Sequence, residues 1–224
     1  MEIELQKELL GKHAADQVQE GCLLGIGTGS TVHYFIKALA KRVRQGLSVR
    51  CVSSSYDSQD LGESLGIPFI EINEVDHLDI TVDGADEITP NNDMIKGGGG
   101  ALFREKLLAI HSEKVVILVD TTKLVESLGK RVLPVEILPF FASATVKKLQ
   151  SLGFSGTLRG APEALFVSDN GNLIYDIGLP SPVEDAALLH TQLIEIPGVL
   201  ETGLFFDLPV TVLSVDESGE LKTR

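Results

Sequence analysis

The stretch Cys22-Leu23-Leu24-Gly25-Ile26-Gly27-Thr28-Gly29-Ser30-Thr31 is the part of the sequence that decides the fold. Its apolar first half predicts a short strand, and its glycines predict a turn. Apolar residues at helical spacing from Val32 to Val43 then predict a helix. A strand, a glycine-rich turn and a helix in this order are typical of a loop that holds a phosphate on backbone N–H groups, with Ser and Thr hydroxyls as further donors.

This turn departs from both common nucleotide-binding motifs. Counted from Gly25, the third glycine of the dinucleotide fingerprint is replaced by Ser30. No acidic residue lies about 20 positions further on to hold a ribose hydroxyl, since Asp57 is the first after the helix. A Walker loop would need a lysine after Gly29. The turn is therefore expected to hold a small phosphate ester, and a plain tight turn with a capped helix is the structural alternative.

Apolar strands alternate with helical patterns over about the first 120 residues, which predicts a parallel, doubly wound sheet. The expected helices are 3–19, 32–43 and 56–65, and the expected strands are 22–26, 49–53, 68–72, 79–83 and 115–120. In such sheets ligands bind at the carboxyl ends of the strands. The polar residues that fall at or just beyond these ends are Thr28, Ser53, Asp83, Lys96 and Asp120.

The stretch from Asp83 to Lys106 contains the most closely spaced candidate catalytic and anion-binding residues. Asp83-Gly84-Ala85-Asp86-Glu87 follows a buried strand, and Lys96 precedes four consecutive glycines, Gly97 to Gly100. A helical pattern with Glu105 one turn in comes next. Flexible backbone at a helix start suits an anion, and a nearby carboxylate suits proton transfer. An ordinary acidic turn followed by a flexible loop is the alternative for either half alone.

The pattern changes after about residue 130. A strand, a helix (143–152), short strands, a hairpin turn at 169–172, a helix (183–194) and a strand (199–206) give a β-α-β-β-α-β order typical of a ferredoxin-like subdomain. Residues 210–215 are expected to return to the first sheet. The expected domains are therefore 1–130 plus 207–224, and 131–206, the second serving packing and oligomerisation.

The composition describes a globular chain of 224 residues with 19 basic and 32 acidic side chains, a formal net charge of −13. This balance argues against nucleic acid or an anionic membrane as partner. A signal peptide and a membrane-spanning run are not expected, and Cys22 and Cys51 are expected to be buried free thiols of a cytoplasmic protein. The five histidines are scattered along the sequence, so no metal is expected.

With these residues in view, the chain resembles the ribose-5-phosphate isomerase family of the A type along nearly its whole length. The matching motifs, in order, are Gly25 to Thr31, Ser53-Ser54-Ser55, Asp83 to Glu87, Lys96 to Lys106, and Leu128-Gly129-Lys130 with Leu133-Pro134-Val135-Glu136. The resemblance implies a Rossmann-like domain joined to a ferredoxin-like one, assembled as a homodimer or homotetramer. It also implies a cofactor-free interconversion of ribose 5-phosphate and ribulose 5-phosphate in the pentose phosphate pathway.

The resemblance makes Glu105 the proton acceptor. It implies that the substrate is bound by Thr28, Gly29, Ser30, Thr31, Asp83, Gly84, Ala85, Asp86, Lys96, Gly97, Gly98, Gly99 and Lys123, with Lys7 near the phosphate. The chemistry agrees, because moving a proton between C2 and C1 through an enediolate needs one carboxylate and donors for the developing charge. Lys96 and the amides of Gly97 to Gly99 are candidate donors, and Asp83 and Asp86 could position hydroxyls. Gly100 stands where relatives often have alanine, and this difference is expected to be harmless.

Two other classes of function remain open at this point. A non-catalytic sugar-phosphate sensor is one, although the sequence has no basic segment for a DNA-binding helix pair. Another sugar-phosphate enzyme on a similar sheet, such as an aminosugar phosphate deaminase or a coenzyme A transferase, is the other. An assay for ketose formed from ribose 5-phosphate separates all three.

Overall fold

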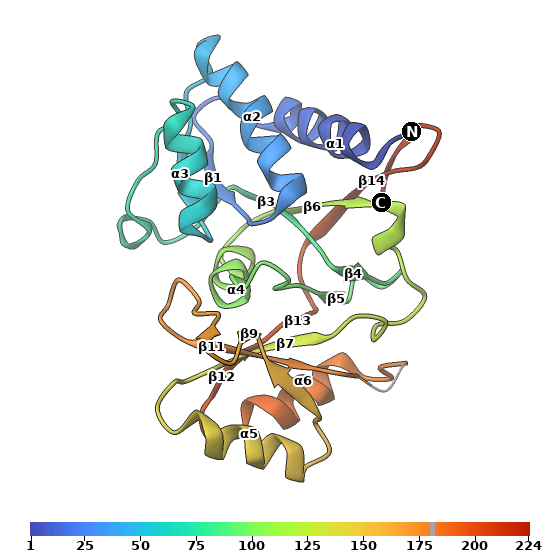
Figure 1. The fold of residues 1–224 in the computed structure, drawn as a ribbon. Coiled ribbons are helices and arrows are strands. Elements are labelled where there is room, and N and C mark those ends of the chain that lie inside the picture. The colour runs from blue at the N-terminus through green and yellow to red at the C-terminus, as the bar shows by residue number, and fades with distance from the viewer. Residues whose placement is uncertain (180–181) are drawn as a thin grey trace. The chain divides into compact units, whose positions relative to one another are not determined.

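The computed structural model describes residues 1–179 and 182–224, and the chain forms two compact units (Figure 1). Unit 1 comprises Met1–Ala85, Arg104–Leu124 and Leu208–Arg224, and unit 2 comprises Asp86–Phe103 and Val125–Asp207. The second unit thus includes 86–103, 125–130 and Asp207 as well as the whole segment 131–206 expected from the sequence. The domain division drawn from the sequence stays a prediction.

A six-stranded sheet forms the centre of unit 1. Its strands are β1 (Leu23–Ile26), β2 (Arg50–Ser53), β3 (Ile80–Gly84), β6 (Val115–Asp120), β14 (Val210–Val215) and β15 (Leu221–Thr223). Their order across the sheet is β15-β14-β6-β3-β1-β2, and every pair is parallel except β14 with the edge strand β15. The expected parallel sheet is confirmed, including the return of 210–215. The strand order reverses between β1 and β3, which is where such sheets bind ligands.

Helices cover both faces of this sheet. They are α1 (Ile3–Gln17), α2 (Ser30–Arg44), α3 (Tyr56–Ser64) and α4 (Leu102–Ile110), with short 3-10 turns at η1 (Ile72–Glu74) and η2 (Thr121–Lys123). Leu24 and Ile26 of β1 pack with Leu10 and Phe35 from α1 and α2, which lie side by side (Figure 1). Leu23 faces the other way and packs with Leu108 of α4. The sheet is therefore doubly wound, as successive side chains of a strand point to opposite faces.

The strand expected at 68–72 does not form. Only Phe69 bridges to Cys51, through the bonds Cys51 N–H to Pro68 O (3.2 Å) and Ile70 N–H to Cys51 O (2.9 Å). Pro68 has no N–H to donate, and the chain turns into η1 at Ile72. An apolar run beside an edge strand is thus reduced to a single bridge.

Unit 2 contains a four-stranded sheet of order β12-β7-β11-β8, with all neighbours antiparallel. The strands are β7 (Leu133–Ile137), β8 (Gly156–Leu158), β11 (Leu173–Ile177) and β12 (Val199–Thr202), and the helices are α5 (Ala142–Ser151) and α6 (Ala186–Ile194). Side chains of both helices pack with the sheet in one core. This is the expected ferredoxin-like arrangement. A small hairpin, β9 (Gly160–Ala161) and β10 (Ala164–Leu165), interrupts it.

A second, three-stranded sheet in unit 2 was not expected. It has the order β13-β5-β4 and consists of β4 (Glu87–Ile88), β5 (Met94–Ile95) and β13 (Leu204–Phe205). The single strand predicted at 199–206 is therefore wrong, because the chain leaves the four-stranded sheet at Gly203. A Cβ at Gly203 would lie 2.3 Å from the carbonyl oxygen of Lys96, so this close crossing requires glycine.

Both cysteines are free and buried, as expected. Burial raises the pKa of the Cys51 thiol to about 12. Burial, together with the charge of Asp79, raises the pKa of the Cys22 thiol to about 11. The two thiols are therefore protonated and poorly reactive at neutral pH. Across residues 1–179 and 182–224, no helix combines the length and the apolar character needed to span a bilayer.

Candidate active site

The first glycine loop (Gly27–Gly29) follows β1 at the point where the strand order reverses. The backbone N–H of Thr28 donates to Asp83 Oδ1 at 3.1 Å. The Thr28 hydroxyl lies 2.7 Å from the hydroxyl of Ser54 and 2.9 Å from that of Ser55. The structure therefore brings together three of the motifs read from the sequence, each at the carboxyl end of a strand.

Glycine is required at positions 27 and 29 of this loop for two different reasons. A Cβ at Gly27 would lie 2.0 Å from the Asp83 carboxylate, so glycine is needed for the close approach of the loop to β3. Gly29 has φ +114 and stands at the N-cap of α2 without a side-chain cap. In contrast, α3 begins at Ser55, whose hydroxyl accepts from Ser58 N–H at 3.3 Å. The start of α2 therefore has N–H groups that its own cap leaves for an anion.

Asp83 is a buried carboxylate with a fixed orientation. Its side chain is only 2% exposed, and Oδ1 accepts from Gly84 N–H at 2.7 Å as well as from Thr28. A charged group this deeply buried is rare without a functional or pairing reason. Its place at the end of β3 agrees with the position expected from the sequence.

Glu105 lies in the first turn of α4 and is 3% exposed. A carboxylate that pointed into bulk solvent could not collect a proton from a bound sugar, and the burial excludes that arrangement. Burial also limits the exchange of a transferred proton with water. Glu105 thus has the environment that a proton acceptor needs.

The two candidate lysines of unit 1 differ in their present contacts. Lys7 donates to Glu4 Oε1 at 3.0 Å, and its side chain is 15% exposed. Lys123 ends η2, a turn whose cap is Asp120, with Thr122 N–H at 2.9 Å from Asp120 Oδ1. The capping explains the Asp-Thr-Thr-Lys pattern after β6 and places Lys123 just beyond a strand end.

Lys96 in unit 2 is 3% exposed and follows β5 directly. Its backbone N–H donates to Gly203 O at 2.9 Å, and its Nζ lies 5.3 Å from the centre of the Phe205 ring. The three-stranded sheet therefore fixes Lys96 through β13, a strand from a distant part of the sequence. Sequence periodicity gave no sign of this support, because β4, β5 and β13 are two residues long each.

The second glycine loop (Gly97–Gly100) follows Lys96 and is held by Asp86. Gly98 N–H donates to Asp86 Oδ2 at 2.8 Å, and a Cβ at Gly98 would lie 2.7 Å from Asp86 Oδ1. In this conformation the Gly98 amide is used inside the protein, so it is not at the same time a donor to a ligand. Neighbouring Glu87 accepts from Gly129 N–H at 2.8 Å and from Arg131 N–H, which marks it as structural.

Arg159 is a functional candidate that sequence reasoning missed. Its Nη1 donates to the carbonyl oxygens of Gly97 (3.0 Å) and Gly98 (3.1 Å). Its Nε and Nη2 bind both oxygens of Asp176, at 2.9 and 2.6 Å. The bidentate pair fixes the guanidinium plane, which in turn holds the backbone of the second glycine loop. An isolated Arg between two short strands, β8 and β9, carries no local signal of this role.

The glycine at position 100 suits the local backbone of this chain. Gly100 has φ +84, in the left-handed region that strains any residue with a Cβ. The Cβ would also lie 2.4 Å from Cε1 of Phe166. Because the Arg159 guanidinium lies 5.6 Å from the centre of the same ring, Phe166 is itself confined.

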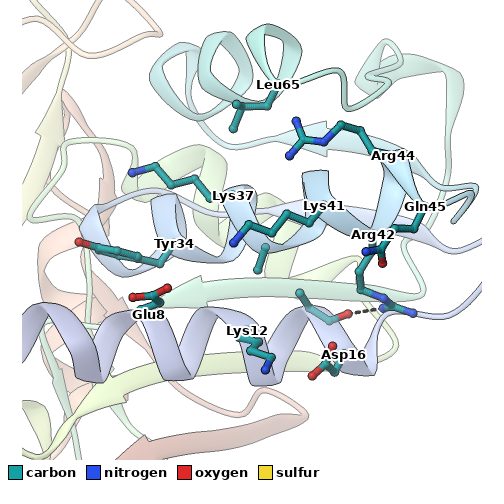
Figure 2. Close-up of a pocket in the computed structure, with 12 residues that line it drawn as sticks. Glu8, Lys12, Asp16, Tyr34, Lys37, Lys41, Arg42, Arg44, Gln45 and Leu65 are labelled. Atoms are coloured by element: carbon teal, nitrogen blue, oxygen red, sulfur yellow. Dashed lines mark hydrogen bonds between the residues drawn. The ribbon is translucent and has the colours of Figure 1, made fainter.

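A basic groove in unit 1 lies outside the predicted site (Figure 2). It has a volume of about 640 Å³, and the charged residues that line it are Glu8, Lys12, Asp16, Lys37, Lys41, Arg42 and Arg44. Arg42 donates to Ala15 O and to Val18 O (2.7 Å), so this cation caps the end of α1. None of the residues predicted for substrate binding lines the groove.

The candidate residues are thus distributed over both units. Unit 1 holds Lys7, Thr28, Gly29, Ser30, Thr31, Asp83, Gly84, Ala85, Glu105 and Lys123, and unit 2 holds Asp86, Lys96, Gly97, Gly98 and Gly99. Within each unit, a glycine loop lies against a carboxylate: Asp83 in unit 1 and Asp86 in unit 2. Buried carboxylates and an uncapped helix start, as in unit 1, and a buried lysine, as in unit 2, are typical of the class of proteins that act on a small anionic substrate by acid–base chemistry.

Comparison with known proteins specifies this class. The family model for ribose 5-phosphate isomerase A (phosphoriboisomerase A) matches residues 50–219. Ribose-5-phosphate isomerase A of Bacillus mycoides (strain KBAB4) is 46% identical over 213 residues, which cover 95% of this chain and 96% of the relative. The chain belongs to the ribose 5-phosphate isomerase A family.

Solved structures agree with this assignment. Ribose 5-phosphate isomerase A from Methanocaldococcus jannaschii superimposes with a TM-score of 0.92 at 34% identity, covering 100% of this chain and 99% of that one. A D-ribose-5-phosphate isomerase in complex with phospho-erythronic acid has a TM-score of 0.94 at 34% identity, with the same coverage. The similarity therefore extends over both units.

Proposed function

We propose that Glu105 moves the proton in the interconversion of D-ribose 5-phosphate and D-ribulose 5-phosphate, the reaction of the family to which this chain belongs. In the forward direction, the Glu105 carboxylate takes the proton from C2 of the open-chain aldose. The electron pair forms the C1–C2 double bond of an enediolate. The protonated carboxyl then returns the proton to C1, while the hydroxyl proton on the C2 oxygen passes to the C1 oxygen. This completes the ketose without any external oxidant or reductant. The observation that carries the proposal is the 3% exposure of this carboxylate in the first turn of α4.

Lys96, together with the backbone amides of Gly97 and Gly99, supplies the charge stabilisation in this proposal. Negative charge develops on the substrate oxygens as C2 loses its proton, and a buried ammonium group stabilises that charge more strongly than a solvated one. Lys96 is 3% exposed, which supports this role. Asp83 and Asp86 are assigned to orienting substrate hydroxyls and to proton transfer during ring opening.

The phosphate is assigned to the first glycine loop and the start of α2. Thr28, Gly29, Ser30 and Thr31 offer backbone N–H groups and hydroxyls, and Lys123 and Lys7 offer positive charge. Lys7 is paired with Glu4 at 3.0 Å, so it would have to exchange this partner to reach a ligand. The complex of a relative with phospho-erythronic acid, a phosphorylated sugar acid, supports a sugar phosphate as the substrate class.

The test is a direct assay of purified protein with ribose 5-phosphate as the only substrate. Formation of ketose at a rate proportional to protein concentration is the expected result. Binding of ribose 5-phosphate without ketose would instead indicate a sensor module. Release of ammonia from an aminosugar phosphate, or acyl transfer from coenzyme A, would indicate the other enzyme class.

We also propose that the protein is cytoplasmic and assembles as a homodimer or homotetramer. The two free thiols fit a reducing compartment. In unit 2, Phe140 is 88% and Phe141 72% exposed, and Leu138 beside them is 43% exposed. Such an apolar patch supports a subunit contact. Light scattering on the parent and on Phe140→Ser measures the mass, and a monomeric parent would contradict the assembly.

A further inference from the structure

Three potential metal ligands meet in unit 1 away from the residues discussed so far. They are His77, Asp79 and Glu113, all exposed, and one ligand atom from each lies within 4.8 Å of the other two. Among the described residues this is the one group of three or more such side chains. The scattered histidines of the sequence gave no sign of it, because Glu113 belongs to a distant segment.

The backbone holds these three residues in register. Leu78 forms a parallel bridge with Ser112; its N–H donates to His111 O at 2.8 Å, and its carbonyl accepts from Glu113 N–H at 2.9 Å. Leu78 is 1% exposed, so His77 and Asp79 on either side of it point away from the core. Glu113 follows Ser112 on the neighbouring segment. The backbone bridge therefore holds the three residues next to one another.

Asp79 is oriented by a further hydrogen bond. Its Oδ2 accepts from Leu23 N–H at 2.7 Å, and its own N–H donates to Leu23 O at 2.9 Å. Metal-binding carboxylates in proteins are usually fixed by such outer hydrogen bonds, which set the direction of the ligand atoms. One of the three ligands is thus already positioned.

The chemistry of the three side chains selects the ion. An imidazole and two carboxylates form a mixed nitrogen and oxygen set, which suits Zn²⁺ and similar transition metals, whereas Ca²⁺ and Mg²⁺ prefer oxygen alone. Zinc–ligand bonds of about 2.0–2.2 Å put tetrahedral ligand atoms roughly 3.4 Å apart. The observed spacing of up to 4.8 Å closes to that value by rotation of exposed side chains.

We propose that His77, Asp79 and Glu113 form a binding site for a divalent transition-metal ion of the Zn²⁺ type. Three protein ligands leave at least one coordination position for water. The ion would link the start of β3 (Ile80–Gly84) to the start of β6 (Val115–Asp120), since Asp79 directly precedes β3 and Glu113 lies two residues before β6. The expected consequence is a clamp that stabilises unit 1.

The site is separate from the catalytic carboxylates. Asp79 lies at the amino end of β3 and Asp83 near its carboxyl end, roughly 13 Å apart at the rise of an extended chain. Isomerase activity is therefore expected to be unaffected by loss of the metal ligands. A failure to bind Zn²⁺ would therefore leave the proposed isomerase reaction intact. A lack of isomerase activity would likewise leave the proposed metal site intact.

Titration calorimetry of ZnCl₂ into untagged protein is the first measurement. One Zn²⁺ per chain and a thermal midpoint that rises with ZnCl₂ are expected. His77→Gln and Glu113→Gln should each weaken Zn²⁺ binding by roughly ten-fold or more. Co²⁺ should give visible absorption bands with the parent protein that are lost in His77→Gln. Isomerase activity without added metal reports that both variants are folded.

The matched control is His33→Gln. His33 Nε2 lies 2.7 Å from Asp57 Oδ2, a pair with the same chemistry but no third ligand. This variant should bind Zn²⁺ like the parent. Absence of Zn²⁺ binding, equal binding by the parent and His77→Gln, or an equal loss in His33→Gln would each overturn the proposal.

Discussion

The two glycine loops of this chain look alike in the sequence but are held in different ways. The first, Gly27–Gly29, follows β1 and is tied to the neighbouring strand by the bond from Thr28 N–H to Asp83 (3.1 Å). The second, Gly97–Gly100, follows a strand of only two residues. It is held by side chains, namely Asp86 at Gly98 (2.8 Å) and Arg159 at the carbonyl oxygens of Gly97 and Gly98 (3.0 and 3.1 Å).

The difference shows what a strand paired on both sides in a parallel sheet does for a loop, since β1 is paired with β2 and β3. The register of the strands fixes the position of a loop at the carboxyl end of such a sheet. The local sequence is therefore enough to predict where that loop lies. A loop on a short strand has little backbone support and needs a side chain that reaches it from elsewhere. Substitution of the proposed proton acceptor is expected to have the largest effect, followed by substitutions that act on the second and then the first glycine loop.

Glu105→Gln should lower kcat by at least about 10²-fold, because the amide cannot accept the substrate proton. Binding of ribose 5-phosphate, measured by calorimetry, should persist. Glu113→Gln makes the same chemical change at a carboxylate outside the proposed active site and should keep the parent rate. Near-parent turnover of Glu105→Gln would show that Glu105 is not the proton acceptor.

Arg159→Ala should lower kcat by about ten-fold or more, since the second glycine loop loses the group that fixes two of its carbonyls. Arg159→Lys keeps the charge but not the bidentate pair with Asp176, so an intermediate rate is expected. Initial rates over a range of ribose 5-phosphate concentrations separate kcat from KM. Parent values of both in Arg159→Ala would show that the loop needs no such support.

Ser30→Ala and Lys123→Ala should mainly raise KM, by several-fold, if the first glycine loop and η2 hold the phosphate. Lys41→Ala is the matched control, because it removes a cation from the basic groove that lacks all predicted substrate contacts (Figure 2). Its KM should equal that of the parent. An unchanged KM in both test variants would assign the phosphate to other residues.

Asp93→Asn should stabilise the protein slightly at neutral pH. Burial, with the charges of Asp207 and Asp185, raises the pKa of Asp93 above its ordinary value of 3.8. The folded protein therefore binds this proton more tightly than the unfolded chain, and stability falls as the pH rises through that range. A gain of up to ~0.5 kcal/mol corresponds to roughly 1–2 °C in Tm at pH 7. Thermal unfolding at pH 3 should show no gain, and an equal gain at both pH values would contradict this cause.

The sequence predicts well what depends on local pattern and strand ends. The strand-turn-helix at Cys22–Thr31, the carboxylate at Asp83 and the ferredoxin-like order were all recognisable because periodicity and glycines mark them directly. The hairpin at 169–172 also forms, with Ser168 N–H bonded to Asn172 O at 2.8 Å. These features are encoded within a few residues of where they appear.

What the sequence did not reveal depends on contacts between distant segments. Arg159 acts on a loop far away in the chain, and no spacing rule connects the two. Gly203 separates β12 from β13, and the Lys96 backbone passes so close to it that no Cβ would fit. This steric reason can be recognised only in the folded structure. His77, Asp79 and Glu113 meet only through the register of Leu78 with Ser112.

The pairing of β14 with β6 has a consequence for how this protein is made. The strand Val115–Asp120 is buried along its whole length and apolar up to Val119, yet its partner Val210–Val215 is synthesised much later. Until then β6 is an unprotected sheet edge, the kind of surface that promotes aggregation of nascent chains. Unit 1 must therefore reach its native state after most of the polypeptide has left the ribosome, and shortening the chain before β14 would yield insoluble material.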